Sequence, residues 1–444
     1  MTQATVVGGG VAGLLSAILL RRLGVEVTLV DKDLACGGLL NSTVAANSVS
    51  FDYGTHYLTD TGVAEIDELL HGWLRPEQWR SFQLIRTGNY FRGAMYGLSP
   101  FIDARQLGEA DFKAGFAELL ATRPFDAAQC SNLRDLLERH SGPTFTRLIH
   151  APILWKQLGA KLEDLHPLTP FVLKRLVCAG AEESRRLKQD PFLDGKIAFA
   201  SYDEGVKPAR HFYPRQGGLG QWVRGLEKSL EAAGAQFRLG RTVTEVRRRG
   251  KVVTDVLLDD GSVLPSDLLV WTIPPFLLLK AASIAFESAP VKARPIGLYH
   301  LTFDRPFLES NYYVTCFDEA LRSFRVTLYP STRGDAQAPP FNCTVEVIVD
   351  AASQLEPSGD TVLQELAHMG IVSPDARLLH RELQVVPVGF PATTHGFMAA
   401  AAKQSALAAE HLHNALLLGR AKCPPFFTTD VLIEAHQAIS RLSL

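Results

Sequence analysis

The chain has 444 residues, of which 46% are hydrophobic and 21% charged, as in ordinary globular proteins with two or three domains. Its net charge of −2 argues against a broad nucleic-acid-binding surface. No run reaches the roughly 18 uninterrupted apolar residues of a membrane span, and the six cysteines form no C-x-x-C pair. We therefore expect a cytoplasmic protein with free thiols, no integral membrane segment and no metal site.

The first predicted unit is strand, turn, helix and strand, and its turn reads Gly8-x-Gly10-x-x-Gly13. Gly8 allows the tight turn, Gly10 lets a pyrophosphate approach the backbone, and Gly13 lets helix and strand pack closely. The first helical residues, Val11 and Ala12, carry N–H groups without partners inside the helix, so they can bind an anion.

The second strand of this unit closes on Asp31, 18 residues after Gly13, and Lys32 follows. An acid at this place accepts hydrogen bonds from a ribose diol, which favours FAD or NAD over NADP. Residues 4–31 therefore predict a dinucleotide site, with the choice between FAD and NAD left open.

A glycine pair, Gly37-Gly38, follows the second strand directly and precedes Leu39. A generic nucleotide-binding unit does not require this pair, which allows a second close approach of the backbone to a ligand. A further strand then ends at Gly54-Thr55-His56. His56 either packs in a loop or acts near the nucleotide, and the sequence leaves both readings open.

These motifs, together with Phe51-Asp52-x-Gly54-x-His56, resemble the FAD-binding N-terminus of the flavin amine oxidase superfamily. The resemblance is strongest to the branch with protoporphyrinogen oxidase-like proteins, carotenoid desaturases and UDP-galactopyranose mutase. It implies that the backbone and side chains of all these motifs surround FAD, with Asp31 on the adenosine ribose. In many members the glycine pair is followed by Arg, whereas Leu39 stands there in this chain.

Residues 59–210 are predicted to form a mainly helical insertion that covers the substrate. Apolar residues recur at helical spacing, and a hairpin is expected over 90–98. The expected helices span 59–74, 111–122, 132–141, 143–149 and 170–189.

Residues 211–285 return to the nucleotide-binding unit. Tyr213-Pro214 precedes a Gly217-Gly218-x-Gly220 turn into a helix, which predicts a plain helix start, with a second nicotinamide site as a remote alternative. A hairpin and a buried strand through Thr272 follow. The resemblance implies that Val243 contacts adenine and that the strand with Thr272 joins the central sheet.

Residues 286–389 read as strands at 300–303, 311–317, 323–329 and 343–349, with a helix over 360–369. Consecutive antiparallel strands after a βα segment predict a separate α+β domain. In the superfamily that this chain resembles, the substrate-binding sheet lies over the flavin at this point. Tyr313, Arg325 and Tyr329 are therefore candidate catalytic residues, unless they face the outside of the sheet.

The last segment contains a buried strand that ends in Gly419-Arg420, then a loop and a helix from Val431, with Thr429 or Asp430 as N-cap. The resemblance implies that Gly419 approaches the FAD pyrophosphate and that this helix points at the flavin. A helix N-terminus stabilises the negative charge of a reduced flavin.

The expected fold is α/β: a split Rossmann-type FAD-binding domain with an inserted α+β substrate domain. The first is expected to comprise 1–58, 211–285 and 390–444, and the second 59–210 and 286–389. The expected partner is a small-molecule substrate and not nucleic acid; a homodimer is left open.

The leading functional prediction is a FAD-dependent oxidoreductase that transfers hydride from a C–H or N–H bond to flavin N5, with His56 as a polar or acid–base group near the ring. Three alternatives are a non-redox flavoenzyme of the UDP-galactopyranose mutase type, a polyprenoid or lipid desaturase, and a flavin-free NAD-dependent dehydrogenase.

Overall fold

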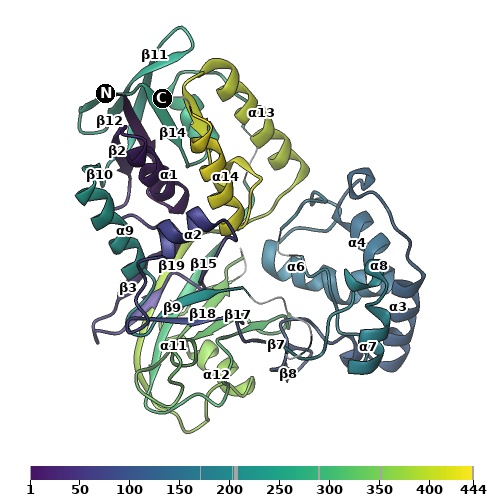
Figure 1. Cartoon of the computed structure of the whole chain (residues 1–444). Coiled ribbons are helices and arrows are strands. Elements are labelled where there is room, and N and C mark those ends of the chain that lie inside the picture. Colours follow the sequence, from purple (N-terminus) through teal and green to yellow (C-terminus); the bar gives the residue numbers. More distant parts are fainter. Residues whose placement is uncertain are drawn as a thin grey trace.

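The computed structural model describes residues 2–170, 172–202, 204, 209–288, 291–350 and 353–442. Figure 1 shows a region with a parallel sheet that holds both chain ends, a large sheet below it, and a group of helices to one side. The first region combines the purple start of the chain with its yellow end, so segments far apart in sequence lie side by side.

A five-stranded parallel sheet forms the centre of the region that holds both chain ends. Its strands come from three separate stretches of the chain. In spatial order they are β10 (Gln236–Leu239), β2 (Glu26–Asp31), β1 (Gln3–Val7), β14 (Leu268–Trp271) and β20 (Ala415–Leu417). Because the strands are parallel, their carboxyl ends meet at one edge, where open α/β sheets bind ligands.

Helices and a small antiparallel sheet cover this central sheet through two apolar clusters. One cluster joins the sheet to α1 (Val11–Arg22), α2 (Ala64–His71), α9 (Gly220–Ala232) and α14 (Thr428–Ser440). The other joins it to α10 (Pro275–Ala281), α13 (His395–His411), β11 (Val243–Arg249), β12 (Val252–Leu258) and β13 (Val263–Pro265).

The large sheet has seven strands, and all of its neighbours pair antiparallel except β16 and β7. Its order is β19 (Leu378–Pro391), β15 (Ala293–Phe303), β18 (Phe341–Ile348), β17 (Ser323–Leu328), β16 (Tyr313–Cys316), β7 (Thr87–Phe91) and β8 (Ala94–Tyr96). The hairpin expected over 90–98 thus contributes two strands to this sheet. Helix α12 (Asp360–His368) packs on its apolar face, and the short helix α11 (Tyr329–Arg333) follows β17.

Smaller strands connect these regions. They are β3 (Ser42–Val44), β4 (Ser50–Asp52), β5 (Leu58–Thr59), β6 (Trp79–Phe82) and β9 (His211–Pro214). The helical group comprises α3 (Glu109–Ala121), α4 (Leu133–Ser141), α5 (Pro143–Phe145), α6 (Ala151–Leu158), α7 (Ala181–Leu187) and α8 (Pro191–Asp194), with a π-helical turn at Thr146–His150.

The helix predicted over 170–189 is wrong in its first half. Helix α7 begins only at Ala181, and Phe171 lies outside the described residues. Leu176 and Val177 instead form extended bridges, in which their backbones bond to Lys196 and Ile102. These tertiary partners satisfy the backbone groups that a helix would have paired locally.

Lys156 on α6 fastens the helical group to the large sheet. Its ammonium donates to the carbonyl oxygens of Cys316, Asp318 and Ser323 at 3.0, 2.6 and 2.9 Å. Burial lowers the pKa of Lys156, but hydrogen bonds from a charged donor compensate for part of the lost hydration. The contact therefore fixes α6 on the ends of β16 and β17.

The buried carboxylate of Asp52, at the end of β4, connects several distant segments. It accepts hydrogen bonds from Ser42 Oγ, Tyr213 Oη and the Leu219 amide at 2.6, 2.6 and 2.9 Å. The Asp52 amide in turn donates to Tyr329 Oη at 2.9 Å.

The second glycine turn wraps around this carboxylate. A Cβ atom at Gly218 would lie 2.4 Å from Asp52 Oδ1 and 2.5 Å from Ser42 Oγ. This close packing accounts for the glycine without a second nucleotide, in agreement with the plain helix start that was expected.

Asp52 should make stability depend on pH. Burial raises its pKa to about 6, although its hydrogen bonds oppose the shift. A raised carboxyl pKa stabilises the fold below the unfolded-state pKa, and this contribution is lost as pH rises through about 6. Two pKa units correspond to about 3 kcal/mol.

Asp52→Asn stays neutral at all these pH values. We therefore expect the free energy of unfolding of the wild type to fall, relative to that of Asp52→Asn, by up to about 3 kcal/mol between pH 4 and pH 7. Urea denaturation of both proteins across this range measures the difference. A stability difference that is independent of pH would contradict the raised pKa.

Candidate functional site

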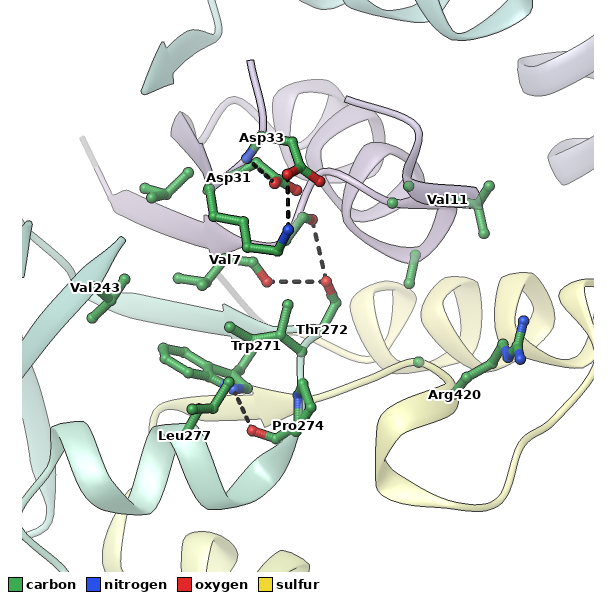
Figure 2. Close-up of a pocket in the computed structure, with 18 of the residues that line it drawn as sticks. Val7, Val11, Asp31, Asp33, Val243, Trp271, Thr272, Pro274, Leu277 and Arg420 are labelled. Carbon is green, nitrogen blue, oxygen red and sulfur yellow. Dashed lines mark hydrogen bonds and ion pairs between the residues drawn. The ribbon is translucent and has the colours of Figure 1, made fainter. Parts of the chain in front are cut away.

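A cavity of about 800 Å³ lies at the carboxyl edge of the central sheet. Its walls come from the ends of β1, β2 and β14, from the turn before α1 and from the segment after β20 (Figure 2). Its volume falls within the range of small-molecule and cofactor sites.

The turn Gly8-x-Gly10-x-x-Gly13 divides its glycines between packing and access. Gly8 has φ +103°, and a Cβ there would lie 2.2 Å from Thr272 Oγ1, while a Cβ on Gly13 would lie 1.9 Å from the Gly8 carbonyl oxygen. A Cβ on Gly10 would meet no atom within 4 Å. Gly8 and Gly13 are thus required by packing, whereas Gly10 leaves space that a ligand can occupy.

Helix α1 presents its N-terminus to the cavity. Its N-cap residue, Gly10, carries no side chain to cap it, and the first helical bond runs from the Leu14 amide to the Gly10 carbonyl. The amides of Val11, Ala12 and Gly13 therefore lack intrahelical acceptors, and the first two residues line the cavity. Partial positive charge at this end suits a phosphate group.

Asp31, at the end of β2, braces the glycine turn. Its Oδ2 accepts from the Gly9 amide at 2.5 Å and its Oδ1 from the Asp33 amide at 2.8 Å. Each oxygen keeps a lone pair, so the carboxylate can still accept from a ribose hydroxyl. Lys32 pairs with Asp33 at 2.8 Å, a contact that raises the Lys32 pKa.

Thr272 joins β14 to the turn, since its hydroxyl donates to the carbonyls of Val7 and Gly8 at 3.0 and 3.2 Å. Figure 2 shows these bonds, with Val243 and Arg420 toward opposite sides of the view. Most of the residues predicted to contact the cofactor line this cavity: Gly8, Gly10, Val11, Ala12, Asp31, Lys32, Gly37, Gly38, Leu39, His56, Val243, Thr272, Gly419, Arg420 and Val431.

The remaining predicted contacts lie elsewhere. Gly13 packs behind the turn, and Gly54 and Thr55 face Glu346 on β18. The N-cap prediction for Thr429 or Asp430 is wrong, because α14 begins at Thr428 after Phe427 and has no side-chain cap. Of this first turn, Thr428 and Val431 line the cavity.

Sequence reasoning missed several wall residues. Trp271, Leu277 and Lys280 line the cavity from β14 and α10, and Arg241 lines it from the start of the small sheet. Trp271 directly precedes Thr272 at a strand end, which is a usable signal. The helix α10 residues carry none, because only the tertiary packing brings that helix to the edge.

His56 lines the cavity beside two cations. Burial lowers its pKa to about 4, and the charges of Arg325 and Arg420 act in the same direction, so the ring is neutral at pH 7. Arg325 forms a two-point ion pair with Glu346, at 2.8 Å for both contacts, and lies 6.0 Å from the Tyr313 ring centroid.

The three candidate catalytic residues of the large sheet therefore lie in two different places. Arg325 and Tyr313 lie together behind His56, on neighbouring strands. Tyr329, by contrast, is 1% exposed, and its hydroxyl bonds to the Asp52 amide and to Thr344 Oγ1. Among the described residues that line the cavity, none is Tyr313, Arg325 or Tyr329.

A second cavity, of about 390 Å³, adjoins the first. The two share Leu39, Pro274 and Arg420 in their walls. Aromatic and aliphatic residues dominate the rest of its lining, among them Phe276, Val388, Phe390, Phe397 and Phe426. This cavity suits an apolar ligand that reaches the edge of the first one.

Comparison with known proteins first identifies the type of fold. Residues 6–71 match the family model of the NAD(P)-binding Rossmann-like domain. The fold is that of reduced UDP-galactopyranose mutase (TM-score 0.78, 17% identity, 99% of this chain and 93% of that one). It is also that of a protoporphyrinogen oxidase-like protein from Exiguobacterium sp. 255-15 (TM-score 0.69, 15% identity, 99% and 98%).

The sequence of this chain is also similar to those of several curated enzymes. The chain is 28% identical over 305 residues to hydroxyneurosporene desaturase of Cereibacter sphaeroides, covering 62% of this chain and 57% of that protein. It is 27% identical over 291 residues to phytoene dehydrogenase of Streptomyces griseus, covering 61% and 54%. It is 22% identical over 317 residues to hydroxysqualene dehydroxylase of Sinorhizobium fredii, covering 68% of each.

The match thus spans little more than half the length of the first two relatives. With the fold, these similarities support the flavin amine oxidase-like superfamily that the motifs indicated. Among the described residues, no helix is long and apolar enough to cross a membrane.

Two alanine substitutions in the first turn should separate packing from access. Gly13→Ala should destabilise the protein by at least about 2 kcal/mol, because the 1.9 Å overlap with the Gly8 carbonyl outweighs any gain in helix propensity. Gly10→Ala, the matched control, should change stability by less than about 1 kcal/mol. Urea denaturation checks both, and equal losses would contradict the assignment.

Proposed function

We propose that this protein is a FAD-dependent oxidoreductase that desaturates an elongated apolar substrate of the polyprenoid type: one carbon gives up a hydride to the flavin, and the neighbouring carbon loses a proton as the C=C bond forms. The observation that carries the proposal is the apolar second cavity, which shares Leu39, Pro274 and Arg420 with the nucleotide cavity. A substrate in the second cavity would present one end of its chain at that shared wall.

The residues of the first cavity fit FAD. The open space at Gly10 and the free amides of α1 would accommodate the pyrophosphate, and Asp31 the adenosine ribose. Gly419, at φ +89°, lies beside this turn, since a Cβ there would contact Thr272 and Ala12 at 3.4 and 3.5 Å. When bound, FAD supplies a hydride acceptor, its N5 atom.

The chain's own residues would position the reacting groups and exclude water from them. The start of α14, through Thr428 and Val431, directs a helix N-terminus at the cavity, where it stabilises negative charge. His56 offers an uncharged ring, because burial and the neighbouring arginines keep its pKa low. The aromatic walls of the second cavity would exclude water from the reacting bond.

A second candidate is a non-redox flavoenzyme that acts on a nucleotide sugar. The Arg420 guanidinium favours it, because this cation lies where the two cavities meet and could bind a diphosphate. The apolar character of the second cavity favours the first candidate instead. Requirement for a reductant, with no net oxidation of substrate, would identify the second.

FAD binding should depend on the open space at Gly10. Gly10→Val should lower FAD affinity at least about 100-fold, since the side chain would occupy that space without disturbing the fold. Flavin absorbance near ~450 nm after gel filtration measures the bound fraction.

Gly180→Val is the matched control for that substitution. Gly180 is also a helix N-cap with open space around its Cβ position, and its φ and ψ (−69°, 174°) nearly equal those of Gly10 (−70°, −177°). It should retain flavin. Stoichiometric flavin in Gly10→Val would refute the assignment of this turn.

The second cavity should govern the reaction with an apolar substrate. Anaerobic mixing with phytoene in detergent micelles should bleach the flavin of the wild type, and Ala400→Trp should slow bleaching by about 10-fold or more because it fills the cavity. Ala399→Trp, the solvent-exposed neighbour on α13, should leave the rate unchanged. Bleaching by amines but not by apolar polyenes would overturn the substrate class.

A further inference from the structure

Glu346, on β18, holds a buried ion pair directly behind the cavity wall. It is 1% exposed, and its two carboxylate oxygens each lie 2.8 Å from a nitrogen of Arg325 on β17. Such a pair is geometrically specific. It adds little net stability, however, because desolvation of two charges offsets their attraction. Its position beside the site therefore points to a role other than stability.

The same carboxylate binds the segment that carries His56. The amide and hydroxyl of Thr55 donate to Glu346 Oε1 at 3.0 and 3.1 Å. The Thr55 hydroxyl also shares a hydrogen bond with Thr327 on β17. Thr55 is therefore fixed to two strands of the large sheet, one residue before His56.

Gly54 brings this segment against the carboxylate. Its φ of +106° is accessible to glycine, and a Cβ atom there would lie 3.3 Å from Glu346 Oε1. Because of this close approach, the loop can pack against the sheet in only one position. The large sheet therefore sets the orientation of His56 in the first cavity.

His56 faces charges from three elements. Arg325 on β17 and Arg420 after β20 disfavour its protonation, whereas Glu346 on β18 and the Tyr53 backbone favour it. Burial is the largest influence. Glu346 thus offsets part of the Arg325 charge as seen by the imidazole ring.

We propose that Glu346 is a positioning residue that seats the Gly54-Thr55-His56 segment on the large sheet and balances the charge of Arg325 at His56. His56 then enters the cavity in one orientation, while burial and the two arginines, and not Glu346, keep its ring uncharged. The inference deepens the proposed function, on which it rests only for the identity of the cofactor that His56 would face.

The test is titration of His56 by NMR in the full chain with FAD bound, using ¹³C-labelled histidine and His56→Gln to assign the signal. Glu346→Gln should lower the His56 pKa and Arg325→Gln should raise it, each by on the order of one unit. Glu356→Gln, which breaks the ion pair of Glu356 with Arg322 instead, should leave the pKa unchanged. Shifts in the same direction, or no shift in either variant, would overturn the proposal.

Thr55→Val provides a second test if Glu346→Gln does not fold. It keeps both charges and removes the hydroxyl bonds to Glu346 and Thr327, so the His56 signal should split or broaden while its pKa changes little. One sharp, unshifted signal would exclude positioning through Thr55. The same titrations without FAD separate the two ideas, because opposite shifts in a protein that fails to bind FAD would refute only the proposed function.

Discussion

The arrangement of the whole molecule depends on one buried carboxylate. Asp52 receives donors from Ser42, from Tyr213 on β9 and from the Leu219 amide before α9, while its own amide reaches Tyr329 beside the large sheet. A charge that is fully buried needs such partners to offset its lost hydration. Because Tyr213 and Leu219 are distant from Asp52 in sequence, and Tyr329 on α11 bonds to its amide, this one residue joins β9, the start of α9 and α11.

The position of that contact decides where the site forms. The strand that ends at Asp52 continues into Gly54-Thr55-His56, so the segment leaves the Asp52 network and reaches Glu346 within a few residues. The nucleotide cavity is thereby lined on one side by a sheet edge that the glycine turn defines, and on the other by a residue held from the large sheet. The second cavity then opens between β19, α10 and α13, beside Arg420.

Local patterns in the sequence predicted most of the residues that gather around the first cavity. Gly8 and Gly13 are required by packing, whereas Gly10 leaves open space, and the spacing of the three glycines alone indicates such a turn. Asp31 and Thr272 follow because strand ends in a parallel sheet meet at one edge. The seven-stranded sheet was predicted from its alternating strands, apart from β19 and the contribution of β7 and β8.

The contacts of the large sheet and of the second cavity could not be predicted in the same way. Glu346 is one polar position in a buried strand, and only its pairing with Arg325 and Thr55 across 21 and 291 residues gives it meaning. Tyr329 follows strand β17 directly, yet α11 begins there and carries the hydroxyl to Asp52. Helix α13 has apolar and small residues on most sides, so its role as a cavity wall emerges only from packing against α10.

The lysine that fastens the helical group has a consequence for molecular recognition. Lys156 holds α6 to three carbonyl groups, and Leu158, two residues further on, forms part of the second cavity. That wall is therefore set by directional bonds and not by side chains free to slide over one another. A cavity of fixed width would select ligands by their thickness. Thin linear chains would enter it, whereas branched or cyclised ends of equal hydrophobicity would not.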